Sequence, residues 1–388
     1  MLMASLGLGL RVKFRPQSEN NFSSNVPVVL TRSTEAWSQD PFGKLYRFAP
    51  DVPRQTDRGR QISGAARREH GEAPTNGINT AGTTSSTLAA EGLFNPVRVT
   101  SGGHTWHRRL TDNLNASNGT RVYCRVRARA GTSGRIAILC SNFTAGVSTE
   151  IRGTLASPSV TSSNAGTITD FINRELPNGD REYTFTWTLN ANGISIFLGI
   201  GPDSAVTGEY IDVIGTQAAS AYTDWIMGGD TTKAIAADIM SLDLTGLDMT
   251  AGFMLKMVGI VDATPGIGFL RLYQAGDSNN RNLINTNETT AAWHVGQFAA
   301  SVNQGTVEIL STVTPPAAFS IVGAHGIDYI GGAYDGDVRT PDTSASYVTP
   351  TTLFIGSVDG EAALPITISR IELVPGAPTT ALVTELAA

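Results

Sequence analysis

Short stretches with an apolar residue at every second position recur through this sequence, and they restrict its fold more than any other feature. The clearest is Arg121–Arg129, whose apolar members are Val122, Cys124, Val126 and Ala128. Successive side chains of a β-strand point to opposite faces, so a period of two indicates a strand with one buried face. No stretch of comparable length shows the helical period. The sequence therefore predicts an all-β protein.

These stretches form two series that meet near residue 238. In the first, residues 182–189 and 193–198 are separated by Asn190–Gly193, an Asn-Gly turn signal. Charged residues are only 16% of the chain, which favours strands and turns over charged amphipathic helices. The predicted fold is all-β, with two tandem antiparallel β-sandwich (jelly-roll) domains, residues 91–238 and 239–388, preceded by an extended N-terminal arm with a linker over residues 1–90.

Two cysteines, Cys124 and Cys140, bear on the first series. Gly131–Gly134 predicts a tight turn, so residues 121–129 and 135–140 are expected to pair as a hairpin that places the two cysteines opposite each other. Two cysteines are too few for a secreted disulfide scaffold, which favours two buried thiols and assembly in a reducing cytoplasm.

Charge is distributed unevenly along the chain, whose net value is −6. Residues 1–90 carry 11 Lys and Arg against 7 Asp and Glu, whereas residues 239–388 carry 5 against 14. The basic residues form no dense run, so no nucleic-acid partner is expected. No apolar run is long enough to span a bilayer, and the N-terminal order of apolar and basic residues is not that of a signal peptide, so no membrane insertion is expected.

Catalytic and metal-binding patterns are scarce. The nearest carboxylate pair is Asp335 and Asp337. Asp335 and the glycine after it form an Asp-Gly unit, however, which is mainly a hairpin turn signal. We therefore expect no enzyme, no catalytic residue and no cofactor. Calcium is the one metal with candidates, the loop carboxylates of Asp277, Asp335 and Asp337, although none has EF-hand spacing.

Two groups of side chains are candidates for contacts with partners. Four arginines of the first strand stand on the face opposite its apolar residues: Arg121, Arg125, Arg127 and Arg129. Like charges on one face repel, so they need local Asp or Glu partners, an acidic neighbouring subunit or an anionic glycan. The aromatic residues that could stack on sugar rings are Trp106, Trp225, Trp293, Tyr329 and Tyr334.

The junction of the two series resembles a seam found in tailed-phage virion proteins. Residues 208–217, 221–226 and 232–238 follow its pattern, and the matching residues are Gly215, Gln217, Tyr222, Thr223, Ile226, Ala236, Ala237 and Asp238. Lys233 stands where the family usually has arginine, and residues 61–68 depart from the family's N-terminal pattern. Near the start, Leu30–Ser33 and Val52–Arg54 are similar to the opening of such proteins.

The resemblance implies a carbohydrate-binding-module-like jelly roll followed by a concanavalin A-like or laminin-G-like domain. It further implies a structural protein of a virion, namely a fibre, spike or decoration subunit. Such a protein would assemble in the host cytoplasm as a homo-oligomer, with a homotrimer favoured. Its expected partners are other virion proteins and a host surface glycan. The N-terminal arginines expected to attach it are Arg32, Arg47, Arg54, Arg58 and Arg60. The alternative is a purely structural virion protein whose sandwiches bind only other virion proteins.

Overall fold

The computed structural model describes residues 10–13, 28–39, 45–51, 55–56, 59–62, 66–68, 82–104, 108–109, 114–220, 225–226, 233–235, 238–262, 271–286, 292–310, 317–356 and 366–388. The chain divides into two compact units. Unit 1 comprises Met1–Ser38, Arg47–Ala65 and Ala236–Ala388, and unit 2 comprises Gln39–Tyr46 and Ala66–Ile235. Both are antiparallel β-sandwiches, which confirms the predicted all-β class.

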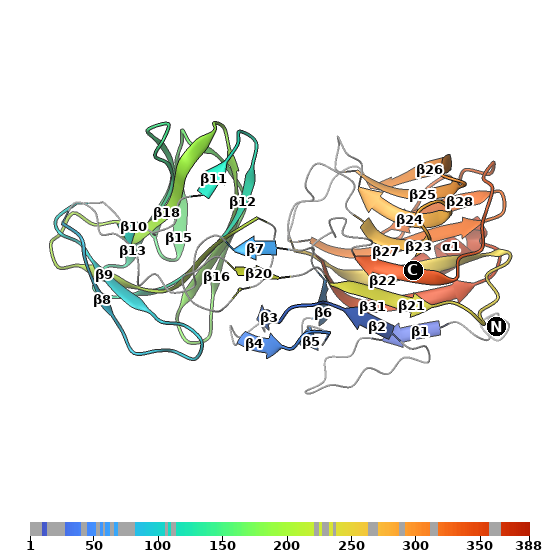
Figure 1. Ribbon diagram of the computed structural model, residues 1–388, viewed down its shortest axis with the longest axis horizontal. Helices are drawn as coiled ribbons and strands as arrows, with labels where there is room; N and C mark the ends of the chain where they lie inside the picture. The colour runs from blue at the N-terminus through green and yellow to red at the C-terminus, as the bar shows by residue number, and fades with distance from the viewer. Residues whose placement is uncertain are drawn as a thin grey trace. The chain divides into compact units, whose positions relative to one another are not determined.

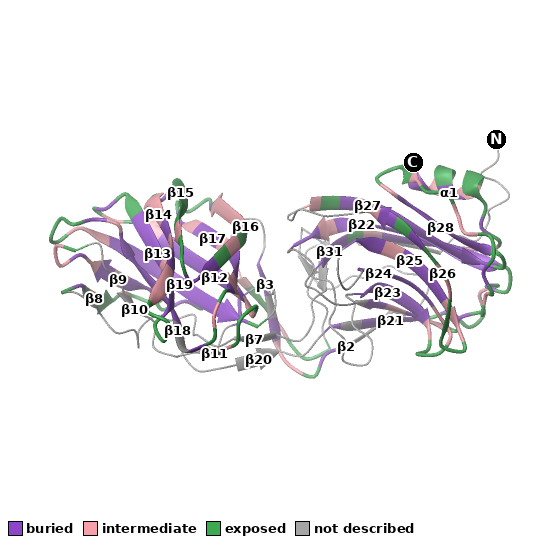
Figure 2. Cartoon of the chain, turned by 90° about the horizontal axis from the view of Figure 1, so that it is seen from above, coloured by how far each residue is buried: buried purple, intermediate pink, exposed green. Residues whose placement is uncertain are grey.

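Unit 2 has two sheets that enclose one core (Figures 1 and 2). The first sheet has the order β16 (Gly166–Glu175), β17 (Arg181–Leu189), β12 (Arg121–Ala130), β19 (Tyr210–Ala219), β7 (Ala66–Arg68) and β20 (Lys233–Ile235), with β9 (Val97–Thr100) on β19 and β8 (Thr84–Thr87) on β9. The second has the order β10 (Arg108–Arg109), β18 (Gly193–Pro202), β13 (Arg135–Asn142), β14 (Val147–Thr154) and β15 (Ser157–Ser163), with β11 (Leu114–Ala116) beside β18.

Unit 1 also has two large sheets. One has the order β29 (Asp337–Val338), β28 (Tyr329–Tyr334), β27 (Ala317–Gly326), β22 (Gly252–Val261), β31 (Ile366–Pro375), β6 (Gly59–Ile62) and β5 (Gln55–Thr56), with β1 (Leu10–Lys13) on β31. The other has the order β2 (Val28–Thr31), β21 (Ile239–Asp243), β30 (Thr352–Gly356), β23 (Arg271–Gly276), β24 (Arg281–Thr286), β25 (Trp293–Ala299) and β26 (Val302–Leu310). A separate pair consists of β3 (Ala36–Gln39) and β4 (Leu45–Phe48).

A single described helix, α1 (Thr380–Ala387), ends the chain. The Thr379 side chain caps it by accepting a hydrogen bond from the Leu382 amide. Val383 and Ala387 pack on the face of unit 1 formed by Met254, Val322 and neighbouring residues. Among the described residues, no helix is long and apolar enough to cross a membrane.

The predicted hairpin between residues 121–129 and 135–140 is wrong. β12 lies in the first sheet of unit 2, between β17 and β19, and β13 lies in the second, between β18 and β14. The turn after β12 therefore crosses from one sheet to the other. Cys124 and Cys140 both point into the core between the sheets, as free and buried thiols.

The N-terminal segment supplies strands to both units. β1, β2, β5 and β6 pair with strands of unit 1, and β7 and β8 pair with strands of unit 2. The structure thus divides the chain at points other than residues 90 and 238, because early segments complete sheets built mainly from later ones. This arrangement differs from the extended arm expected from the weak apolar period of residues 1–90.

Candidate functional site

One face of the second sheet of unit 2 combines polar, charged and aromatic side chains. On β13, Ile136, Ile138 and Cys140 enter the core, so Arg135, Ala137, Leu139 and Ser141 lie on the opposite face, which we call the outer face. The two strands that pair with β13, β14 and β18, extend this face on either side. Leu139 lies between Gly199 of β18 and Glu150 of β14, and Ala137 lies between Gly201 and Arg152.

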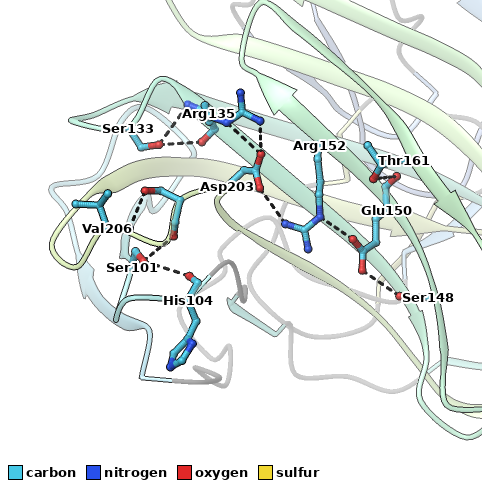
Figure 3. Close-up of polar contacts among 11 residues, drawn as sticks. Ser101, His104, Ser133, Arg135, Ser148, Glu150, Arg152, Thr161, Asp203 and Val206 are labelled. Carbon is cyan, nitrogen blue, oxygen red and sulfur yellow. Dashed lines mark hydrogen bonds and ion pairs between the residues drawn. The ribbon is translucent and has the colours of Figure 1, made fainter.

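A row of alternating charges crosses the outer face (Figure 3). Arg135 donates two hydrogen bonds to Asp203 Oδ2, at 3.2 and 2.7 Å. Arg152 donates to Asp203 Oδ1 at 3.0 Å and to Glu150 Oε2 at 2.6 Å. Two guanidinium groups and two carboxylates are thus joined in one network, and their formal charges cancel.

Hydroxyl groups extend this network. Ser148 donates to Glu150 Oε1 at 3.2 Å, and Thr161 donates to the Glu150 carbonyl oxygen at 3.3 Å. Ser101 is buried and lies apart from this network, and its hydroxyl donates to the Ser204 carbonyl at 2.8 Å. Donors and acceptors therefore alternate along the face (Figure 3).

An aromatic pair adjoins the same face. Phe143, in the turn between β13 and β14, is 65% exposed, and its ring centroid lies 6.5 Å from that of Phe197. Phe197 lies opposite Ser141, which in turn lies opposite Ser148. Ser141 lies six positions after Arg135, so the charged row and the aromatic pair together extend over about 20 Å of strand.

Sequence reasoning missed Phe143 because it considered only Trp and Tyr as sugar-stacking residues. One signal was available: an aromatic residue in the turn Asn142–Gly146, where polar residues and glycine are usual.

None of the four described sugar-stacking candidates lies on this face. Trp225, Trp293 and Tyr329 are buried, and a buried ring offers no face to a sugar, so those three predictions are corrected. Tyr334 is half-buried against Trp293 in an edge contact. Trp106 lies outside the described residues.

The four arginines of β12 were candidates for contacts with partners, but other segments of the chain cover two of them. Arg125 and Arg127 are buried. Arg125 donates to Gln39 Oε1 at 3.1 Å, and its guanidinium lies 3.4 Å from Glu182 and 5.7 Å from the Trp225 ring. Trp225 itself donates to Glu182 Oε2 at 3.2 Å.

Asp180 pairs with the next two arginines along β12. Its carboxylate accepts from Arg127 Nε at 2.7 Å and from Arg129 Nε at 2.6 Å, and Arg129 also bonds Glu91. Burial raises the pKa of Asp180, but hydrogen bonds from Arg129, Asn178 and Arg127 outweigh this effect, so its pKa is lower than usual. Arg121 lies 4.0 Å from Asp170. The local acidic partners considered for these arginines are thus present.

Of the N-terminal arginines, Arg32 and Arg47 each pair with an acidic side chain of unit 1. Arg32 is fully buried and donates to Asp238 Oδ1 at 2.8 Å within unit 1. Arg47 is exposed and pairs with Glu35. Arg60 lies in β6, and Arg54 and Arg58 lie outside the described residues.

The calcium candidates stabilise turns. Asp277 Oδ1 accepts from the amides of Asn279 and Asn280, both at 2.7 Å, and these backbone hydrogen bonds lower the Asp277 pKa. Asp335 accepts from the Ser320 amide at 2.7 Å, and Asp337 pairs with Arg339 at 3.2 Å. Within the described ranges, no three His, Cys, Asp or Glu side chains form a group that could hold a metal.

Comparisons with known proteins give only distant structural similarity. No protein-family model matches the sequence, and no curated protein matches it. A structure of botulinum neurotoxin type C, described as entering cells through two ganglioside molecules, is 6% identical, with a TM-score of 0.32 over 39% of this chain and 40% of the toxin chain. Domains LG4-5 of the mouse laminin α1 chain are 10% identical, with a TM-score of 0.26 over 76% of this chain and 90% of theirs.

Trypanosoma rangeli sialidase is also similar, at 9% identity and a TM-score of 0.29 over 98% of both chains. The expectation that this protein is not an enzyme is contradicted by the presence of a sialidase among these similar structures.

Proposed function

We propose that this protein binds glycans through the outer face of unit 2. The observation that carries the proposal is the exposed Phe143 ring, whose neighbour Phe197 adjoins the Ser148 end of the row of paired charges and hydroxyls. Sugars present apolar C–H faces and hydroxyls that both donate and accept hydrogen bonds. An exposed aromatic ring packs on the first, and carboxylates beside guanidiniums bond the second.

The charge balance of this face favours an uncharged glycan. Each guanidinium of the row already bonds a carboxylate, at 2.6–3.2 Å. An acidic sugar would approach Glu150 and Asp203 and be repelled by both, whereas neutral hydroxyls can bond either sign of charge. The anionic glycan considered for the arginines of β12 has no such site, because carboxylates of the same unit pair with them.

We further propose that the protein is a structural component of a phage or phage-like virion. The support is the sequence resemblance, and two of its matching motifs meet in the fold. Arg32 comes from the N-terminal motif and Asp238 from the junction motif, and they form a buried ion pair. Gln217 and Ile226, two further matching residues, are joined by a 2.7 Å hydrogen bond. Attachment through the N-terminal segment, a homotrimeric state and location on the virion belong to the same proposal.

Glycan binding is tested by an array of neutral and acidic glycans probed with the full chain, the Phe143→Ala variant and the control Ile327→Ala. Ile327 is 63% exposed but lies in unit 1. We expect Phe143→Ala to weaken binding at least about tenfold, equivalent to 1.4 kcal/mol. The control should bind as the original chain does.

Two results would change the proposal. If no glycan binds, the purely structural virion role remains and glycan binding is refuted. If glycans bind equally well to Phe143→Ala, the outer face is not the site. Immunogold labelling of purified particles from producing cells tests the virion role separately, and unlabelled particles would contradict it.

A further inference from the structure

Phe143 stands on a turn whose backbone is closed by its own hydrogen bond. The turn comprises residues 143–146 and joins β13 to β14. The Gly146 amide donates to the Phe143 carbonyl at 3.1 Å. Gly146 has a φ of 66°, in the left-handed region that glycine adopts without strain. The sequence of this turn therefore suits its backbone conformation.

Asn142, the residue before this turn, holds it to a second turn. Its Oδ1 accepts from the Ala145 amide at 3.2 Å, within the first turn. Its Nδ2 donates to the carbonyls of Ala191 and Asn192, at 3.4 and 3.3 Å, in the turn between β17 and β18. Because the oxygen meets a donor and the nitrogen meets acceptors, these contacts fix the orientation of the carboxamide.

The second turn is itself held in place. Asn192 Oδ1 accepts from the Asn118 amide at 2.7 Å, in the turn that precedes β12. Gly193 lies against the Asn142 carboxamide, and a Cβ atom at that position would be 2.5 Å from Asn142 Oδ1. Only glycine therefore leaves room for the Asn142 side chain. Hydrogen bonds thus lead from one turn to the next and end at the turn that carries Phe143.

We propose that Asn142 is a positioning residue of the glycan site, an inference that rests on the proposed function. Asn142 is fully buried, so it cannot touch a sugar and acts only through the turn. The carboxamide holds this turn in one conformation before a glycan arrives. A binding group that is already fixed loses less conformational freedom on binding, which increases affinity.

Asn142→Asp tests this role. Aspartate keeps the size and the acceptor for the Ala145 amide, but it replaces the donor to two carbonyls with an oxygen that repels them. Asn173→Asp is the matched control. Asn173 Nδ2 also donates to two consecutive carbonyls, those of Leu155 and Ala156 at 3.1 and 2.8 Å, but in the turn between β14 and β15. The control removes the same kind of contact elsewhere in unit 2.

The first measurement needs no glycan. Order parameters from ¹⁵N relaxation report how rigidly the Phe143 amide is held. We expect about 0.85 in the original chain and in Asn173→Asp, and below about 0.6 in Asn142→Asp. A value below about 0.6 in the original chain, or the same value in all three proteins, would overturn the inference. If Asn142→Asp does not fold, Asn142→Ala takes its place, because it removes the carboxamide without adding a charge.

The second measurement is the affinity for the neutral glycan that binds best on the array. We expect Asn142→Asp to bind it at least about fivefold more weakly, and Asn173→Asp to bind it as the original chain does. In the Phe143→Ala background, Asn142→Asp should cause no further loss, because Asn142 acts through Phe143. A further loss there, or full affinity in Asn142→Asp alone, would overturn the inference. If the original chain binds no glycan, the proposed function fails, and the order parameters alone decide whether Asn142 holds the turn.

Discussion

Asp180→Asn is the substitution whose effect the structure defines most closely. The Asp180 side chain has no exposed surface and accepts from Arg127, Arg129 and Asn178 at 2.7, 2.6 and 2.9 Å. Asparagine keeps the shape but replaces one acceptor oxygen with a donor and removes the negative charge. Removing one partner from a buried ion pair typically costs about 3–5 kcal/mol, because the other charge stays in the interior.

We expect Asp180→Asn to lower the unfolding free energy of unit 2 by about that amount, which corresponds to a fall in Tm of about 6–20 °C for a domain of this size. Differential scanning calorimetry and urea unfolding followed by tryptophan fluorescence would measure it.

Glu91→Gln provides a matched control because Glu91 also bonds Arg129. Its side chain is 37% exposed, however, so its ion pair should contribute only about 0–1 kcal/mol. If Asp180→Asn and Glu91→Gln proved equally mild, the assignment of the β12 arginines to a buried network would be refuted.

Acid should affect unit 2 through the same carboxylate. The folded-state pKa of Asp180 is lowered from 3.8, so its stabilising contribution is present above the unfolded value and is lost as pH falls through the folded one. Unit 2 should therefore lose stability below about pH 4. This loss should be smaller in Asp180→Asn, and identical pH profiles would contradict the reasoning.

Three further results are expected. His325 is fully buried, and burial lowers its pKa to about 3. The unfolding free energy of unit 1 should therefore fall by up to about 1.4 kcal/mol per pH unit as the pH drops from 6.5 toward 3. His325→Gln should flatten this pH dependence in urea titrations. Asp238→Asn removes the carboxylate that pairs with the buried Arg32 and should lower the unfolding free energy of unit 1 by about 3–5 kcal/mol. A fall of less than about 1 kcal/mol in urea titrations would argue against the ion pair. Gly215→Ala would place a Cβ atom 2.8 Å from the Phe94 ring and should lower the unfolding free energy of unit 2 by about 1–3 kcal/mol, measured by calorimetry.

The sequence alone determined the fold class and many of the strands. The period of two in residues 121–129 correctly assigned Val122, Cys124, Val126 and Ala128 to the core, since this period depends only on local backbone geometry. The Asn-Gly turn likewise separated the strands that became β17 and β18. Local chemistry was sufficient for these features because neighbouring residues alone set them.

Only the tertiary structure decided what lies against each strand. The turn after β12 could join two strands of one sheet or cross to another, and its residues suit both, so the hairpin prediction failed. Arg125 stands on the polar face of its strand, yet Gln39 and Trp225, distant in sequence, bury it. Phe143 stayed exposed although its chemistry suits a core. Alternation identifies the two faces of a strand, but segments far away in sequence determine which of them meets water.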